Sequence, residues 1–273
     1  IKKNKVTNIL ILFLLSHTII WTLIPSVANT NLPLDTIEAL AWGNNLQFGY
    51  DKHPPLSAWF LEFFYNIFGS QDWAYYFLSQ LFVISSFVIV FKFSEDFFNN
   101  PIYSLISVLL LEGIYFYNFT TPEFNVNVCQ LPFWALTVYY CWRGINKNDI
   151  SSWLLLGLFA GLGILSKYLF IYLLIAIDIF FIYLIINKKF NFKCLISFIS
   201  FLIILIPHLV WLVDNNYATI YYGIFRSVND PLSGFGSIQI MNHILYPAIF
   251  LLKQAVVITP LLIMFYFIIS KFK

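Results

Sequence analysis

Long apolar runs are the feature of this sequence that most restricts its fold. Runs of roughly 18 to 22 residues match a bilayer core about 30 Å thick when they coil into helices. With 60% hydrophobic and 10% charged residues, the chain has more apolar surface than one water-soluble core of 273 residues can bury. We therefore predict an all-α polytopic membrane protein, a helical bundle of about eight transmembrane helices. The expected spans are 6–27, 72–93, 102–119, 124–143, 151–166, 168–187, 194–213 and 254–271.

The distribution of lysine and arginine gives the expected orientation. Cytoplasmic loops carry an excess of these residues. With the N-terminus in the cytoplasm, eleven basic residues fall inside and four, namely Lys52, Lys167, Arg226 and Lys253, fall outside. The extracytoplasmic loops are then about 28–71 and 214–253, and within the latter 236–253 is compatible with an interfacial helix. Acidic residues gather on the same outer side although they contribute little to topology, which points to chemistry there.

The stretch from Leu34 to Trp59 concentrates charge in a chain that has little of it. If 34–48 is helical, Asp35 and Glu38 lie three residues apart on one face, opposite an apolar stripe that includes Phe48. Two carboxylates would then face one aqueous pocket at the membrane surface. The alternative is that Asp35 merely sits favourably in the first turn, against the helix dipole.

Two prolines follow this predicted helix in Tyr50-Asp51-Lys52-His53-Pro54-Pro55. Each proline disfavours helix in the residue before it, so the segment is expected to be an extended loop that places a cation and an imidazole beside the carboxylates. Lys52 could instead extend toward lipid headgroups, as interfacial lysines commonly do. The aromatic segment 56–68 is too short to span a bilayer and predicts a second helix in the interface plane.

Three further outer residues are candidates for a site. Glu123 follows a short Thr-Thr-Pro loop, and its alternative role is that of an ordinary carboxylate at a helix N-terminus. Lys167 lies in a tight turn, where it either extends toward lipid or meets an anionic ligand. Arg226 is the only outer arginine, and its guanidinium suits phosphate recognition.

Other polar and small residues lie within the expected spans. Glu112 and Asp178 are costly there unless they face protein or water, and no basic partner was evident in a span. A glycine series predicts close approach of two helices, and the three cysteines show no disulfide or metal-binding pattern. The glycines are Gly157, Gly161 and Gly163, and the cysteines are Cys129, Cys141 and Cys194.

Together these residues resemble the GT-C membrane glycosyltransferases, in particular the bacterial branch of the protein O-mannosyltransferase and lipid A aminoarabinose transferase superfamily. The resemblance covers essentially the whole chain. Thr36 stands where the family often has an acidic residue, with Glu38 as a possible replacement. Family members are longer, so the chain is expected to be an N-terminal fragment of one transmembrane glycosyltransferase domain (1–273). The matching motifs are Asp35, Ala41-Trp42, Gly49-Tyr50, His53-Pro54-Pro55-Leu56, Trp59, Thr121-Pro122-Glu123 and the segment from Gly157 to Lys167.

The resemblance implies sugar transfer from a polyprenyl-phosphate donor to a lipid, glycan or protein acceptor, at the extracytoplasmic face of the inner (plasma) membrane. It makes Asp35 the catalytic base. The donor phosphate would be held by Lys52, His53, Arg226 and Lys167, with Glu38, Glu123 and Tyr50 as acceptor or sugar contacts. No cofactor is firmly predicted, a divalent cation is compatible with the paired carboxylates, and nothing indicates nucleic acid binding.

Two other classes compete with this interpretation. A transporter or flippase of a lipid-linked or anionic substrate would need charged or broken helices near the midplane and a repeat between its halves, and the sequence shows no repeat. A structural membrane subunit would leave the outer acidic residues unexplained.

Overall fold

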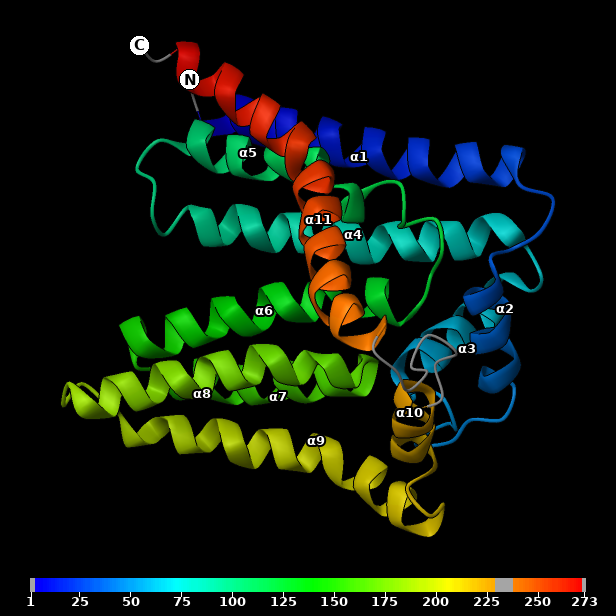
Figure 1. The fold of residues 1–273 in the computed structure, drawn as a ribbon. Helices are drawn as coiled ribbons and strands as arrows, with labels where there is room; N and C mark the ends of the chain where they lie inside the picture. The colour runs from blue at the N-terminus through cyan, green and yellow to red at the C-terminus, as the bar shows by residue number, and fades with distance from the viewer. Residues whose placement is uncertain (1–2, 229–237, 272–273) are drawn as a thin grey trace.

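The computed structural model describes residues 3–228 and 238–271, and the regular structure in these ranges is entirely helical (Figure 1). Short 3₁₀ turns occur at Leu110–Gly113, Tyr115–Tyr117, Tyr168–Phe170 and Phe192–Cys194. The α-helices are α1 (Lys3–Ala28), α2 (Leu34–Gly43), α3 (Leu56–Phe68), α4 (Asp72–Ser94), α5 (Pro101–Leu109), α6 (Val126–Lys147), α7 (Ile150–Ser166), α8 (Ile171–Ile186), α9 (Leu195–Asp214), α10 (Ala218–Val228) and α11 (Ile238–Lys271).

Five described helical segments are long and apolar enough to cross a membrane. They coincide with the spans expected at 6–27, 72–93, 168–187, 194–213 and 254–271. Two shorter apolar helical segments, Pro101–Gly113 and Ile150–Ser166, lie among them. The prediction of an all-α polytopic membrane protein is therefore confirmed.

The short helices α2, α3 and α10 gather at one end of the bundle, which we call the loop end (Figure 1). Both chain termini lie toward the opposite end. This arrangement follows from length, because α2, α3 and α10 have only 10, 13 and 11 residues and cannot span a bilayer. The sequence prediction of two short helices in the first loop is confirmed.

Helix α7 packs closely against α9 because its glycines lack side chains. A Cβ atom at Gly157 would lie 2.0 Å from the carbonyl oxygen of Ser197, and one at Gly161 would lie 2.8 Å from Ile204. Neither distance is physically possible, so a larger residue would push the helices apart. The predicted small-residue contact surface is confirmed for Gly157 and Gly161, whereas Gly163 faces the ring of Phe170 in the next 3₁₀ turn.

The expected span at 102–119 is wrong as a continuous helix. Helix α5 ends at Leu109, two 3₁₀ turns follow, and Ile114 is extended, with φ −106° and ψ 114°. Asn118 Nδ2 donates to the Glu112 carbonyl oxygen at 2.8 Å, a group that a continuing helix would bond internally. Gly113 meets α11 closely, since a Cβ there would lie 2.7 Å from Leu261 Cα. The apolar composition of 102–119 gives no sign of this break, so the sequence predicted a continuous helix.

Helix α11 also differs from expectation, because it runs from Ile238 to Lys271 without interruption. The expected span at 254–271 and the described part of the interfacial helix considered for 236–253 therefore belong to one element, and residues 236–237 lie outside the described residues. Lys253 is exposed on this helix, so its ammonium group is not forced into the bundle interior. In Figure 1, α11 crosses obliquely in front of α4 and α6, which form part of the bundle behind it.

Helix α2 buries a different face from the one predicted. Thr36, Ala39 and Gly43 are buried, whereas Leu34 is 77% exposed and the expected apolar stripe lies outward. The helix ends at Gly43, so Phe48 is not part of it. A Cβ at Gly43 would lie 2.8 Å from the Ala58 carbonyl oxygen, so close contact with α3 selects the small-residue face.

Candidate active site

The first turn of α2 holds Asp35 and is fastened to the loop before α6. The Asp35 backbone N–H donates to Glu123 Oε1 at 3.3 Å. The Thr36 hydroxyl, fully buried, donates to the Phe124 carbonyl oxygen at 3.1 Å. The two bonds fix the start of α2, and the Asp35 side chain remains partly exposed. Thr36 thus supports the backbone at a position where an acidic side chain was expected.

Lys52 and Glu38 form an ion pair one turn further along α2. Lys52 Nζ lies 2.6 Å from Glu38 Oε2, with 21% and 33% of the two side chains exposed. The hydrogen bond to Glu38 raises the pKa of Lys52, and the charge of Asp35 adds to this effect. Lys52 is therefore a stable cation held beside both carboxylates.

His53 is electrically neutral near pH 7. Burial lowers its pKa to about 4, and the positive charges of Lys52 and Lys167 act in the same direction. Its ring packs edge-on against Trp42, with 5.9 Å between ring centroids. A neutral imidazole still has one N–H to donate, so it can bind an oxyanion without adding charge.

Lys167 lies between α7 and the 3₁₀ turn at Tyr168–Phe170. Its Nζ donates to the side-chain oxygen of Asn127, near the N-terminus of α6. Burial lowers the pKa of Lys167, while the negative charge of Asp35 opposes that shift. The Asp35 carboxylate therefore interacts with lysines from two segments that are 115 positions apart in the sequence (167 − 52).

These interactions define a loop-end cluster of five side chains, namely Asp35, Glu38, Lys52, His53 and Lys167. The cluster combines residues from α2, from the loop at 50–55 that contains Pro54 and Pro55 (the proline loop), and from the end of α7. Glu123 adjoins it through the Asp35 backbone. Most of the residues predicted to form the site are thus brought together.

Two predicted site residues, Tyr50 and Arg226, are not among the side chains of the loop-end cluster. Tyr50 is only 6% exposed, stacks on Trp42 at 5.6 Å, and donates its hydroxyl to the Asn45 carbonyl oxygen. Arg226 is exposed on α10, one turn after Tyr222, a residue that acts electrostatically on Lys52. Arg226 makes none of the described hydrogen bonds within the loop-end cluster.

The sequence interpretation missed a set of residues that hold the proline loop from the other side. His208, 2% exposed, donates from Nδ1 to the Phe48 carbonyl oxygen at 2.5 Å and accepts from the Tyr168 hydroxyl at 2.6 Å. Thr219 donates to the Tyr50 carbonyl oxygen at 2.6 Å. The only signal for His208 was a polar residue within an apolar run.

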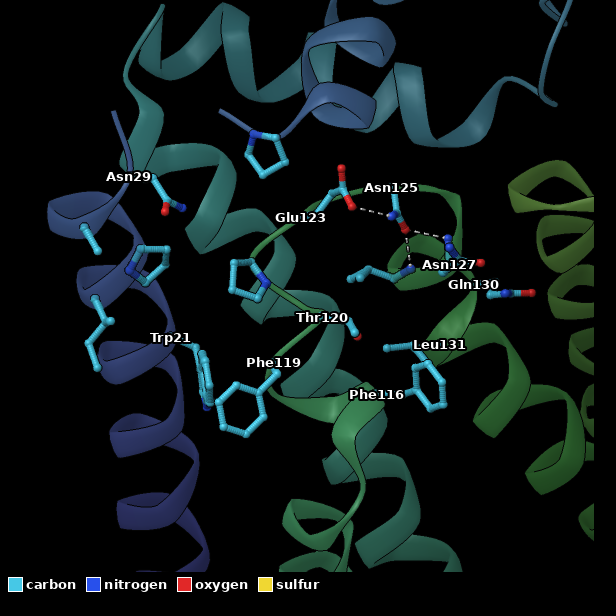
Figure 2. Close-up of a pocket in the computed structure, with 16 residues that line it drawn as sticks. Trp21, Asn29, Phe116, Phe119, Thr120, Glu123, Asn125, Asn127, Gln130 and Leu131 are labelled. Atoms are coloured by element: carbon cyan, nitrogen blue, oxygen red, sulfur yellow. Dashed lines mark hydrogen bonds between the residues drawn. The ribbon is translucent and has the colours of Figure 1, made fainter. Parts of the chain in front are cut away.

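A cavity of about 800 Å³ opens beside Glu123, between the end of α1 and the start of α6 (Figure 2). One part is apolar, and Figure 2 shows Trp21 and Phe119 side by side there, with 5.2 Å between centroids. The other part is lined by Glu123 and by amide side chains, namely Asn29, Asn125, Asn127 and Gln130. Asn127 also binds Lys167, so the cavity adjoins the loop-end cluster.

No metal site is evident in the part of the chain that the structure describes, since it has no group of three or more His, Cys, Asp and Glu side chains. The three cysteines are buried and unpaired. Their burial places all three in the packed interior of the bundle.

Residues 52–211 match the family described as dolichyl-phosphate-mannose-protein mannosyltransferase, over more than half of the chain. The chain belongs to this family. The match includes Lys52, His53, Glu123 and Lys167, whereas Asp35 lies outside it. It agrees with the resemblance to GT-C membrane glycosyltransferases, as do the apolar helices of a multi-pass membrane protein.

One curated relative of this mannosyltransferase family member is the undecaprenyl phosphate-alpha-4-amino-4-deoxy-L-arabinose arabinosyl transferase of Wigglesworthia glossinidia brevipalpis. The two are 27% identical over 151 residues, which cover 52% of this chain and 26% of the relative. The chain thus spans about a quarter of the relative's length. No solved structure matches this chain.

Proposed function

We propose that the chain transfers a sugar from a polyprenyl-phosphate donor to an acceptor at the extracytoplasmic face of the inner membrane. Family membership supports the reaction class. The single observation that carries the site assignment is the ion pair of Lys52 with Glu38, one turn from Asp35 on α2, and the charge of Asp35 acts on the same lysine. The lysine distribution in the sequence supports the orientation.

The chemistry requires a base and a group of phosphate-binding residues. The acceptor hydroxyl or amine loses a proton as it attacks the anomeric carbon, while the bond to the donor phosphate breaks and the phosphate leaves as a stable anion. In the proposal, Asp35 takes the proton. Lys52 and Lys167 stabilise the departing charge, His53 donates a hydrogen bond, and Arg226 approaches from α10.

The acceptor side is assigned to the cavity beside Glu123. Its lining has a carboxylate and several amides but no basic residue among those described, so a phosphate would be held less well there than at the lysines. Glu123 then contacts the acceptor or sugar. Glu38 holds Lys52 through Oε2 and offers Oε1 to a sugar hydroxyl, and Tyr50 supports the proline loop.

A flippase or transporter is the second candidate, and one observation favours it. The chain has a broken segment at 110–118, where Glu112 is paired with His17 inside the bundle. Broken helices with charged groups occur in transporters. No described element repeats this arrangement in the other half of the chain.

The two functions differ in whether a glycosidic bond forms. Membranes containing the full-length protein are supplied with radiolabelled polyprenyl-phosphate sugars, and the label is followed into lipid, glycan and protein fractions. Transfer of the label to a new acceptor, with release of polyprenyl phosphate, is the expected result. Movement of intact donor between leaflets without release of polyprenyl phosphate would favour the transporter.

The orientation has its own test. Asn45 is exposed in the loop after α2, and the three native cysteines are buried. In the Asn45→Cys variant, an impermeant maleimide added to intact cells should label the protein. Labelling only after lysis would place the loop end in the cytoplasm and contradict the proposal.

A further inference from the structure

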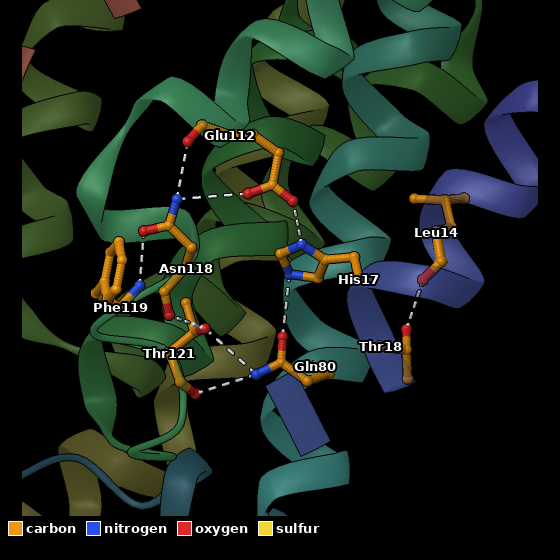
Figure 3. A network of polar contacts seen from close by, with 8 residues as sticks. All are labelled: Leu14, His17, Thr18, Gln80, Glu112, Asn118, Phe119 and Thr121. Carbon is orange, nitrogen blue, oxygen red and sulfur yellow. Dashed lines mark hydrogen bonds and ion pairs between the residues drawn. The ribbon is translucent and has the colours of Figure 1, made fainter. Parts of the chain in front are cut away.

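Five polar side chains meet inside the bundle, and none of them belongs to the loop-end cluster (Figure 3). We call this set the polar ring. Four of its members are almost completely buried, with exposed fractions of 0 to 6%, and the fifth, Glu112, is partly buried. The ring joins α1, α4 and the broken segment after α5. Its members are His17, Gln80, Glu112, Asn118 and Thr121.

The hydrogen bonds constrain the protons of the ring. Gln80 Nε2 donates to the Thr121 carbonyl oxygen at 3.5 Å and to its hydroxyl at 3.3 Å, so Gln80 Oε1 faces His17. His17 Nε2, 3.1 Å away, must therefore donate. Its Nδ1 then shares one proton with Glu112 Oε1 at 2.5 Å. Wherever that proton lies, the His17–Glu112 pair has no net charge.

The ring also fixes the turn that leads into the site. Thr121 donates to the Asn118 carbonyl oxygen at 2.7 Å, and Asn118 donates to the Glu112 carbonyl oxygen at 2.8 Å. Figure 3 shows these contacts closing around the turn at 118–121. Two and three residues after Thr121, Glu123 and Phe124 accept the hydrogen bonds that hold the first turn of α2, where Asp35 lies.

We infer that the polar ring is a positioning device for the catalytic base, and that His17, Glu112 and Thr121 are its positioning residues. Its effect on catalysis rests on the function proposed above. Ionisable groups at this depth are costly unless they are paired, and irregular backbone is tolerated there only when protein or water satisfies it. In the ring, Glu112 is paired with His17, and the irregular backbone at 112–121 is satisfied by Asn118 and Thr121. The loop that these bonds order then contacts α2 through Glu123 and Phe124.

The first test is Glu112→Gln in the full-length protein. An amide at 112 cannot share the proton as a carboxylate does: it can only donate an N–H to the Nδ1 of a neutral His17, which replaces the 2.5 Å contact with a longer and weaker bond and moves the segment that carries it. Misplacement of a catalytic group by about 1 Å can cost on the order of 100-fold in rate. We expect kcat to fall about 10- to 100-fold, while KM for a polyprenyl-phosphate sugar stays within about twofold. Wild-type kcat would overturn the inference.

Two milder substitutions at Thr121 test the inference if the Glu112→Gln protein does not insert into the membrane. Thr121→Val removes the hydroxyl that joins Gln80 to Asn118 and keeps the side-chain shape. Thr121→Ser keeps the hydroxyl. The inference predicts a loss of kcat for Thr121→Val and near wild-type kcat for Thr121→Ser; equal values for both variants would contradict it.

A labelling experiment separates this inference from the proposed function, because it needs no activity. Thr120 lies in the turn and lines the cavity. In the Thr120→Cys background, Glu112→Gln should raise the rate of maleimide labelling about tenfold. Asp178→Asn, an in-span acid on α8 outside the ring, is the control and should leave the rate unchanged. If Glu112→Gln leaves the labelling rate unchanged, the positioning role is overturned. If Glu112→Gln raises the labelling rate but the protein without this substitution transfers no sugar, only the proposed function is overturned.

Discussion

The loop-end cluster and the polar ring each contain one short acid–base pair, and the pairs differ in what surrounds them. Lys52 and Glu38 are 2.6 Å apart with 21% and 33% of their side chains exposed. His17 and Glu112 are 2.5 Å apart, and the His17 side chain is fully buried. Water screens the first pair, whereas removal of one partner from the second leaves a buried group unsatisfied. Similar pair geometry therefore suits one region for binding ligands and the other for holding structure.

The largest expected effect on stability comes from breaking the buried pair. Removing one partner of a buried ion pair costs about 3–5 kcal/mol. We expect Glu112→Gln to lower the unfolding free energy by less than this, about 1.5–3 kcal/mol, because the amide still donates a neutral hydrogen bond to His17. Chemical denaturation in detergent micelles measures it. A loss below about 0.5 kcal/mol would remove the contrast between the two regions.

The next effect concerns donor binding at the loop-end cluster. Hydrogen bonds to charged groups contribute about 1.5–3 kcal/mol, which corresponds to about 10- to 100-fold in affinity. Lys167→Met should weaken binding of a polyprenyl-phosphate sugar by this factor and change stability little. Lys92→Met, an exposed lysine at the end of α4, is the matched control and should bind normally. Equal affinity in both variants would exclude Lys167 as a phosphate contact.

The pH dependence of stability sharpens the description of His53. Its pKa in the folded protein is about 4, below the usual histidine value of 6.5, so the unfolded chain binds more protons between these values. Stability contributed by neutral His53 is therefore present above pH 6.5 and is lost as the pH falls toward 4. We expect a loss of about 1 kcal/mol between pH 7 and pH 5, reduced for partial exposure. His53→Gln should abolish this part of the pH slope in thermal unfolding, and an unchanged slope would contradict the assignment.

The smallest effect is expected at the partly exposed pair of Lys52 and Glu38. Ion pairs at a protein surface contribute about 0–1 kcal/mol. A double-mutant cycle of Lys52→Gln and Glu38→Gln should give a coupling energy within that range. Coupling of about 3 kcal/mol would mean that this pair holds the fold as the polar ring does, and the proposed division of roles would fail.

The sequence predicted the local features well because they depend on residues near one another. Apolar runs predicted the five helical segments that are long enough to cross a membrane, and Pro54 and Pro55 predicted the loop that places Lys52 and His53 after α2. The two short helices followed from length and charge. The charge of Asp35 acts on both lysines, as expected if these residues form one site.

The features that the sequence did not reveal depend on distant contacts. His17 is the in-span partner of Glu112, 95 residues away, so the absence of a basic partner was a wrong conclusion. The break after Leu109 depends on contacts with α11 and Asn118, whereas apolar composition alone favours a continuous helix. The burial of Tyr50 likewise depends on Trp42 and on Thr219, which arrives from α10.

The central claim is that Asp35 takes the acceptor proton, and the rate of a single turnover with saturating donor tests it most directly. General base catalysis contributes about 100- to 10,000-fold. Asp35→Asn keeps the backbone bond to Glu123 and should lower this rate by that factor while donor affinity stays near the wild-type value. Asp72→Asn, an exposed acid at the start of α4, should retain the wild-type rate. A properly inserted Asp35→Asn protein that transfers sugar at the wild-type rate would contradict the account.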